Sequence, residues 1–451
     1  MKNTSHWAFS PWQPLSPITV SLAVGSILWM GAGLLAPRAA LAAPASAVAT
    51  AEPSGPLHAA VVRMLYAASA TSQTLEQDPS SALLTQKRQI DRSWVRSGAS
   101  TQPANIAPEL TRAQERLLST LAEEDEDYAQ AIQALRTAVT ALASLPDGLA
   151  ALWRYNAGDE GAALTAWDRL IDHQTQLKPA DLVNLRRYVA MLALDARGKG
   201  KVGTRAVLLR YETLTQLDTR VHADWMALGT LYQDEKQWSK ARTALTHATQ
   251  TASTDPERCE AFDELGDVQT ELDDLASALK SYQTCLTIRQ KLAKTHADDL
   301  DVQRDLSVSY DNVADTFAAM DDLNGALKHY QAGLAIRQKL AKAEPQNIDW
   351  QRDLGDSHMD IGDILSAQGH AASAAKSYQA SVTIRQALHQ TEPDNPEWQR
   401  DLIISLMKLS EASGQKTHAQ RALKLVRRMQ SLNAWGPEDA DVVETLEQLA
   451  K

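Results

Sequence analysis

The tetrapeptide Gln-Arg-Asp-Leu occurs three times in this chain, beginning at Gln303, Gln351 and Gln399, with a constant step of 48 in residue number. Self-similarity at a fixed period of this length is typical of repeat architectures, in which each unit packs only on its neighbours. We therefore expect a solenoid and not a single compact core. A tyrosine, an alanine and an Ile-Arg-Gln tripeptide keep the same step: Tyr282, Tyr330 and Tyr378; Ala278, Ala326 and Ala374; Ile288, Ile336 and Ile384.

Each repeat unit is predicted to be a pair of antiparallel helices. Apolar and small residues recur at helical spacing on both sides of a short turn such as residues 367–370. Pro345 and Pro393 precede two of the tetrapeptides, at places where a helix should end. The chain has only 3 Phe and 20 Gly, and it contains no run of alternating β-branched residues that would indicate a sheet. These features predict an all-α fold.

Small residues mark where the two helices of a unit should cross. Gly266 and Ala278 lie on either side of one predicted turn, and removing side-chain bulk at both positions lets two helix backbones approach closely. In an antiparallel pair, Phe262 and Tyr282 lie one turn further out, so we expect these two rings to pack together. The following units repeat the small pair as Ala314 with Ala326 and Gly362 with Ala374.

One stretch resembles the tetratricopeptide repeat (TPR) family closely. It contains the pattern Trp-x-x-Leu-Gly-x-x-Tyr, an alanine at the twelfth position after the glycine and a closing Asp-Pro: Trp225, Leu228, Gly229, Tyr232, Ala241, Leu245, Ala248, Asp255 and Pro256. The resemblance implies a right-handed superhelix of helical hairpins whose concave groove holds a peptide or a helix of a partner. The period of 48 exceeds the usual ~34 of the family, and longer second helices, such as residues 323–342, account for the surplus.

The beginning of the chain differs from the rest. Lys2 precedes a mostly apolar stretch, residues 18–35, and Ala40-Leu41-Ala42 offers a small-x-small cleavage site. This pattern predicts a secretory signal and a periplasmic or secreted protein, with an uncleaved anchor as the alternative. The expected organisation is a signal (1–42), a flexible linker (43–56), an irregular helical region (57–145), degenerate TPR-like hairpins (146–220), the TPR array (221–400), and a last degenerate hairpin with a capping helix (401–451).

The net charge of the whole chain is −11. An acidic surface repels phosphate, so nucleic acid is not expected as a partner. The same surface attracts cationic peptides, although a modest excess of acids also serves solubility alone.

The chain has two cysteines, Cys259 and Cys285, which lie opposite each other in the predicted hairpin. In an oxidising compartment they would form a disulfide that closes the loop between them; the alternative is a pair of buried thiols.

Other motifs give no sign of chemistry. Residues 198–203 spell the Gly-x-Gly-x-x-Gly dinucleotide fingerprint, but a helical run precedes them where the motif needs a strand, so a turn is expected. The eleven histidines show no metal-ligand spacing, and no nucleophile, P-loop or zinc-protease motif occurs. We expect no cofactor, no metal and no enzymatic activity.

An acidic stripe follows the predicted first helices, where Glu260, Asp263 and Asp267 share a face. Transferred from the TPR resemblance, this stripe would line the groove, and the alternative is internal pairing with Lys280, Lys328 and Lys376 of the second helices. The predicted groove residues are Met226, Gln233, Glu260, Asp263, Asp267, Asp311, Asp315, Asp356, Met359 and Asp363.

These features predict an exported scaffold or adaptor that binds a basic or extended segment of another protein. Two alternatives stay open. The region 57–145 is a small catalytic or sensory domain that the repeats position, or the whole chain is a structural spacer that assembles with itself.

Overall fold

The computed structural model describes residues 56–69, 90, 111–118, 126–431, 434–435 and 440–451. Within these ranges the regular elements are helices and no strand occurs, which confirms the all-α prediction. The expected signal, almost all of the linker and much of the region 57–145 lie outside them. The chain divides into two compact units, Met1–Ser253 and Thr254–Lys451, here called unit 1 and unit 2. The division falls inside the range 221–400 predicted as one array.

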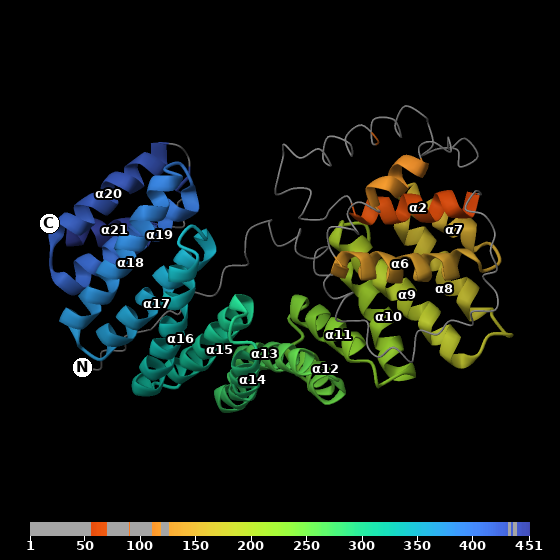
Figure 1. Ribbon diagram of the computed structural model, residues 1–451, viewed down its shortest axis with the longest axis horizontal. Coiled ribbons are helices and arrows are strands. Elements are labelled where there is room, and N and C mark those ends of the chain that lie inside the picture. The colour runs from red at the N-terminus through yellow and green to blue at the C-terminus, as the bar shows by residue number, and fades with distance from the viewer. Residues whose placement is uncertain (1–55, 70–89, 91–110, 119–125, 432–433, 436–439) are drawn as a thin grey trace. The chain divides into compact units, whose positions relative to one another are not determined.

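Unit 1 contains three helical hairpins, α7 to α12, which α2 and α6 precede in the described part of the chain (Figure 1). Helix α7 packs on α8, α9 on α10 and α11 on α12, while α2 and α6 contact each other and α7. The bounds are α2 Pro56–Ser69, α6 Glu126–Ala143, α7 Gly148–Asn156, α8 Glu160–Asp172, α9 Pro179–Gly198, α10 Thr204–Leu217, α11 His222–Asp234 and α12 Trp238–Thr251.

Unit 2 is a series of hairpins in which each helix packs on the helices before and after it (Figure 1). We call α13, α15, α17 and α19 the first helices and α14, α16, α18 and α20 the second helices. The bounds are α13 Asp255–Glu271, α14 Leu275–Thr295, α15 Leu300–Ala319, α16 Leu323–Ala343, α17 Ile348–Ala367, α18 Ala371–Thr391, α19 Pro396–Ser413, α20 Lys416–Ser431 and α21 Ala440–Leu449.

The repeat period determines where these helices begin. Asp299, Asn347 and Asn395 stand directly before three first helices, and each side chain accepts hydrogen bonds from backbone N–H groups of the following turn. Such N-caps satisfy donors that a helix leaves unpaired. In the hairpin turns Asp321 and Gly369, which occupy the same position of successive repeats, adopt positive φ angles of 62° and 77°.

The helix crossing differs in one detail from the sequence prediction. A Cβ atom added at Gly266 would lie 2.5 Å from Cε1 of Tyr282, and one at Gly362 would lie 2.5 Å from Cε1 of Tyr378. The missing side chain of the glycine therefore makes room for the tyrosine ring. No ring contact joins Phe262 to Tyr282 among the described residues, so the expected aromatic pair was wrong: the ring packs on the glycine instead.

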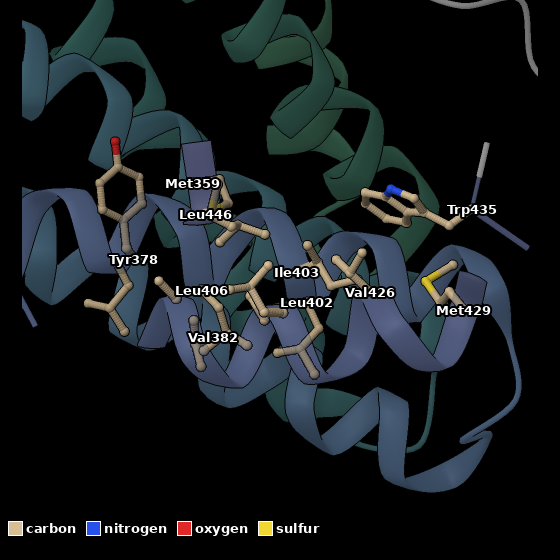
Figure 2. Close-up of a cluster of buried hydrophobic side chains, with 14 of the residues drawn as sticks. Met359, Tyr378, Val382, Leu402, Ile403, Leu406, Val426, Met429, Trp435 and Leu446 are labelled. Atoms are coloured by element: carbon tan, nitrogen blue, oxygen red, sulfur yellow. The ribbon is translucent and has the colours of Figure 1, made fainter. Parts of the chain in front are cut away.

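The C-terminal end of unit 2 is closed by a hydrophobic cluster (Figure 2). Leu402 and Leu406 of α19, Val426 and Met429 of α20, and Leu446 of α21 are at most 1% exposed. A repeat array leaves an apolar face uncovered at each end unless a terminal element caps it, and α21 provides this cap. Within the described residues, no helix has the length and apolar character needed to cross a membrane.

Candidate partner-binding face

The predicted groove residues separate into core residues and surface residues. Met226 and Met359 are 5% and 7% exposed, so both are part of the core and the prediction that they line a groove was wrong. Their apolar side chains serve the packing between helices, and Met359 belongs to the cluster of Figure 2. Gln233 is half-buried in α11 of unit 1. The seven predicted acids all belong to first helices of unit 2.

Three of these acids accept a hydrogen bond from the repeated tyrosine. The hydroxyl of Tyr282 donates to Asp267 over 2.5 Å, and the hydroxyl of Tyr378 donates to Asp363 over 2.6 Å. Tyr330 donates to Asp315 in the same way. Asp267 and Asp315 are exposed residues, so the tyrosine holds each carboxylate in place at the surface.

The arginine of the Ile-Arg-Gln tripeptide neutralises other acids of the stripe. Arg289 lies 2.9 Å from Asp263 of its own hairpin and donates over 2.7 Å to Oγ of Ser309 in the next first helix. Arg337 pairs with Asp311 and donates over 2.6 Å to Ser357. Each arginine thus joins three consecutive helices of the stack.

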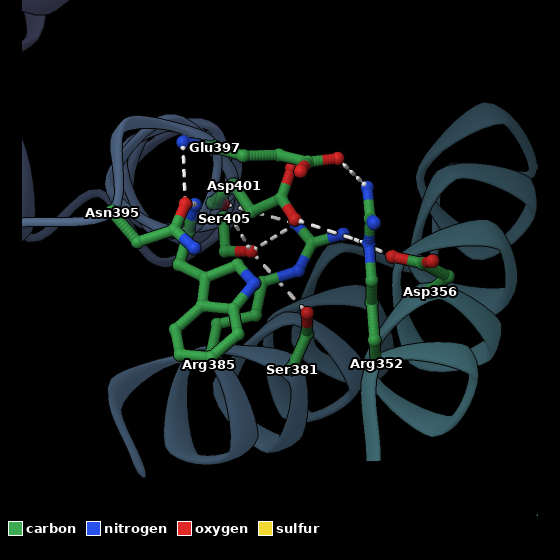
Figure 3. A network of polar contacts seen from close by, with 9 residues as sticks. Arg352, Asp356, Ser381, Arg385, Asn395, Glu397, Asp401 and Ser405 are labelled. Atoms are coloured by element: carbon green, nitrogen blue, oxygen red, sulfur yellow. Dashed lines mark hydrogen bonds and ion pairs between the residues drawn. The ribbon is translucent and has the colours of Figure 1, made fainter. Parts of the chain in front are cut away.

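The third hairpin uses the same arginine with a different acid (Figure 3). Met359 occupies the position that corresponds to Asp263 and Asp311, and Arg385 instead lies 2.5 Å from Asp356. It also donates over 2.6 Å to Ser405 and over 3.0 Å to the carbonyl of Asp401 in α19.

Internal pairing therefore occurs, but through arginines. Lys280, Lys328 and Lys376 are exposed, and within the described part of the chain none of them makes an ion pair with these acids. The alternative that named the lysines as partners was wrong, because the second helix presents its arginine toward the first helices and its lysine to solvent.

The Gln-Arg-Asp-Leu tetrapeptide is a structural link between repeats. Arg304 lies 2.8 Å from Asp353 of the next tetrapeptide. Arg352 lies 3.7 Å from Asp401 of the one after that and 2.5 Å from Glu397 (Figure 3). The glutamine at its start, Gln351, donates to the carbonyl oxygens of Ala341 and Pro345 and so fastens the beginning of α17 to the preceding loop.

The sequence prediction did not identify these arginine links, although Ser309, Ser357 and Ser405 repeat with the same step of 48. A serine at a constant separation from each repeated arginine was the available signal.

The acids of the first helices lie close together and are partly desolvated. Desolvation raises the pKa of Asp263 to about 6 and outweighs the attraction of Arg289. It raises the pKa of Asp267 and of Asp311 to about 7, and neighbouring acids add to both shifts. Desolvation, followed by repulsion from Glu264, Glu257 and Asp263, also raises the pKa of Glu260. Removing a carboxylate from water can cost more than one nearby cation returns.

Charge is separated between the two sets of helices in unit 2. The four first helices carry 19 acidic and 5 basic residues, whereas the four second helices carry 15 basic residues and no acidic one. The stack therefore has one acidic layer and one basic layer. We use the name acidic face for Glu260, Asp263, Asp267, Asp311, Asp315, Asp356, Asp360 and Asp363.

Cys259 and Cys285 are joined by a disulfide that connects α13 to α14, with a Cα–Cα distance of 4.6 Å. The corresponding positions of the next hairpin hold Ser307 and Gly333. A Cβ at Gly333 would lie 3.3 Å from the carbonyl oxygen of Ser307, so the two helices also approach closely there. The disulfide thus occupies a place that the next hairpin fills with small residues.

Residues 198–203 comprise the last residue of α9 and the turn to α10, with Gly200 at a φ of 69°. They follow a helix and not a strand, so the dinucleotide-binding geometry is not formed. Among the residues that the structure describes, no group of His, Cys, Asp and Glu side chains could hold a metal ion.

Comparison with known proteins finds similarity only to solved structures. No family model and no curated protein matches the sequence. YrrB, a TPR protein with an unusual peptide-binding site, is 15% identical with a TM-score of 0.31, and the match covers 45% of this chain and 84% of YrrB. The TPR-like repeats of a kinesin light chain from Podosopora anserina are 18% identical with a TM-score of 0.36, covering 48% and 98%. MamA is 17% identical with a TM-score of 0.33, covering 44% and 96%.

Similarity at these levels concerns the fold alone. The observations that classify the fold are the chain's own: consecutive helical hairpins, a glycine or alanine where the helices of the repeated hairpins of unit 2 cross, and stacking of each hairpin on the next within each unit. The described residues therefore have a TPR-like fold of stacked helical hairpins.

Proposed function

We propose that this protein is an exported scaffold that binds a cationic, extended segment of a partner protein along the acidic face of unit 2. The observation that carries the proposal is the separation of charge into layers. A binding surface of one sign attracts a partner of the other sign and rejects partners of its own sign. The first helices have the excess of acids, so they are the side that fits a basic segment.

Asp360 is the member of this face that most needs a cation. It is half-buried and has no hydrogen bond or ion pair within the described part of the chain. Desolvation and the neighbouring Asp315, Asp311, Asp356 and Asp363 raise its pKa well above the usual range for aspartate. A lysine or arginine of a partner would relieve this repulsion, because an opposite charge favours the ionised form of a carboxyl group.

The export part of the proposal rests on residues 1–42, which lie outside the described residues. An apolar stretch after a single cation and before a small-x-small site is the pattern of a secretory signal. The disulfide between Cys259 and Cys285 suits an oxidising compartment. The expected partner is therefore a protein of the cell envelope or its exterior with an accessible basic segment.

The test uses acids that are not paired with arginine. The variant Glu260→Gln, Asp267→Asn, Asp315→Asn, Asp360→Asn removes four ionisable carboxyl groups and keeps, at positions 267 and 315, an oxygen that can accept the tyrosine hydrogen bond. Asp263 and Asp311 stay unchanged, because their loss would remove the carboxylate partner of the half-buried Arg289 and of the buried Arg337 and would test folding instead. The matched control is Asp159→Asn, Glu235→Gln, Asp298→Asn, Glu447→Gln, four exposed acids outside the face.

We expect the face variant to lose binding of a synthetic oligolysine peptide and capture of envelope proteins, while the control variant retains both. Circular dichroism should show both variants folded. Equal binding by the face variant and the wild type would contradict the proposal.

A further inference from the structure

The second helices of unit 2 carry a column of lysines that none of the contacts above uses. One lysine occupies the same position in four successive hairpins, and all four are exposed: Lys280, Lys328, Lys376 and Lys424. No acidic residue occurs on these helices to neutralise the column. Within the described residues, none of the four lysines makes an ion pair.

The first helices carry a column of acids with the same period. It runs through four successive hairpins as Asp267, Asp315, Asp363 and Glu411. Asp267, Asp315 and Glu411 are exposed, and the side chain of Asp363 is 46% exposed although it pairs with Lys408 of α19. Both columns advance by one hairpin per step, so the stacking of the same hairpins sets the spacing of both.

From this match we propose that unit 2 has a second interaction surface, the lysine column, and that its partner is the acid column of a second copy of this chain. The charges are opposite, each column has four members, and the steps correspond. The long stem of lysine allows its ammonium group to follow small differences in spacing. A contact between two different surfaces of identical chains leaves both outer surfaces free, so copies can add in a row.

The proposal predicts self-association that depends on concentration and salt. Sedimentation equilibrium of the purified chain at about 0.05 M salt should show a mass that rises with protein concentration, and about 0.5 M salt should return it toward the monomer because exposed charges are then screened. A monomer mass throughout the concentration series at low salt would overturn the proposal.

Two variants locate the contact. Lys280→Glu, Lys328→Glu, Lys376→Glu, Lys424→Glu reverses the lysine column and should weaken self-association by roughly tenfold or more, the sum of several modest surface pairs. Lys178→Glu, Lys201→Glu, Arg205→Glu, Arg242→Glu changes the net charge equally at exposed positions of unit 1 and should leave self-association close to that of the wild type. Equal loss in both variants would contradict a specific column.

Mixing two variants tests which surfaces meet. The variant Asp267→Asn, Asp315→Asn, Asp363→Asn, Glu411→Gln removes the acid column and leaves the lysines. It should associate with itself as weakly as the lysine-reversed variant does, whereas a mixture of the acid-neutralised and lysine-reversed variants should behave differently. The first supplies lysines and the second supplies acids, so the mixture should form one-to-one complexes and nothing larger. Absence of this complex would overturn the proposal, as would tight binding of the wild-type monomer to anionic vesicles in its place.

This inference shares the acid column with the proposed function but does not depend on it. The lysine-reversed variant retains the acidic face, so it should still bind oligolysine. If this variant loses self-association and still binds oligolysine, the two surfaces are separate. If it keeps self-association and still binds oligolysine, the proposal for the lysine column is wrong and the proposed function is not affected.

Discussion

Units 1 and 2 are both built from helical hairpins, yet their polar links differ. In unit 2 the same arginine and serine positions recur once in every repeat and connect each hairpin to the next. In unit 1 the links are individual: Arg187 holds Asp224 over 2.9 Å, and Arg210 holds Asp168 over 2.5 Å. Hairpins therefore stack in unit 1 without any repeated polar link. In unit 2 the polar positions repeat with the hairpins, and this repetition is what forms a face of one charge along the stack.

The largest expected effect comes from breaking one arginine link. Arg337 is 7% exposed, and Arg337→Met would leave Asp311 without its cation and Ser357 without its donor. Removing one partner of a buried ion pair costs about 3 to 5 kcal/mol. Hydrogen exchange should show lost protection in α15, α16 and α17 while unit 1 stays protected.

Two matched changes sharpen this comparison. Arg187→Met leaves Asp224, whose side chain is 2% exposed, unpaired, so it should weaken protection in unit 1 and not in unit 2. Lys339→Met on the surface of α16 should change neither unit. Uniform loss of protection across the whole chain after Arg337→Met would argue against independent stacks.

The disulfide should have the next largest effect. Replacing both cysteines by serine removes the covalent link between α13 and α14, at a cost of about 2 to 4 kcal/mol. Because hairpins in a stack stabilise only their neighbours, the loss should be greatest in α13 to α16 and weaken toward α21. Hydrogen exchange under reducing conditions gives the same measurement without mutation. Unchanged exchange in α13 and α14 would show that packing alone holds this hairpin.

The helix crossing should give a smaller effect. In Gly362→Ala the new methyl group meets the ring of Tyr378, and such overpacking costs about 1 to 3 kcal/mol. Ala314 occupies the corresponding position of the middle hairpin, where a methyl group is already accommodated. Ala314→Gly should cost only about 1 kcal/mol. Thermal unfolding of the two variants compares these costs, and equal midpoints would contradict the close approach at Gly362.

The smallest effect concerns pH. The folded chain raises the pKa of Asp311 to about 7, above its value of about 4 when unfolded. Folding therefore favours the protonated carboxyl, so this contribution is complete below pH ~4 and is lost as pH rises through 7. Lowering the pH from 8 to 6.5 should stabilise unit 2 by about 1 kcal/mol through Asp311, and Asp267, whose pKa is also raised to about 7, should add a similar amount.

The same titration distinguishes the two units. Desolvation raises the pKa of Asp224 in unit 1 to about 6. The stabilisation of unit 1 on acidification should therefore begin at a lower pH than that of unit 2. Desolvation lowers the pKa values of His358, His389 and His418, so folding disfavours their charged forms. In more acidic solution these histidines should therefore reduce the free energy of unfolding and offset part of the stabilisation by the acids. Urea unfolding at several pH values, with Asp311→Asn as the control, measures the difference. An unchanged pH slope in that variant would rule out Asp311 as its source.

Periodicity predicted the fold well because stacked hairpins impose local rules. The repeat period, the turn at 367–370 and the glycine and alanine at the crossings all follow from helix geometry, and the structure contains hairpins at these places. The division of the array after Ser253 could not be predicted from the repeat pattern, because α11 and α12 match the TPR pattern best and yet belong to unit 1.

The acidic face was only half predictable. Spacing places Asp263 and Asp267 on one side of a helix, but it does not tell which acid meets a buried cation. That choice depends on where the second helix of the hairpin places Arg289, which lies 2.9 Å from Asp263. The sequence did not single out Asp360, because its raised pKa comes first from desolvation and then from Asp315 and Asp311 of the neighbouring helix together with acids of its own helix, and burial and contacts between helices cannot be read from one helix.

Hydrogen exchange of the full chain with and without a synthetic oligolysine peptide tests the central claim most directly. If the acidic face binds cationic segments, protection should increase in α13, α15 and α17, and it should stay the same in α14, α16 and α18 and throughout unit 1. Protection that appears on the second helices or in unit 1, with none on the first helices of unit 2, would contradict the account.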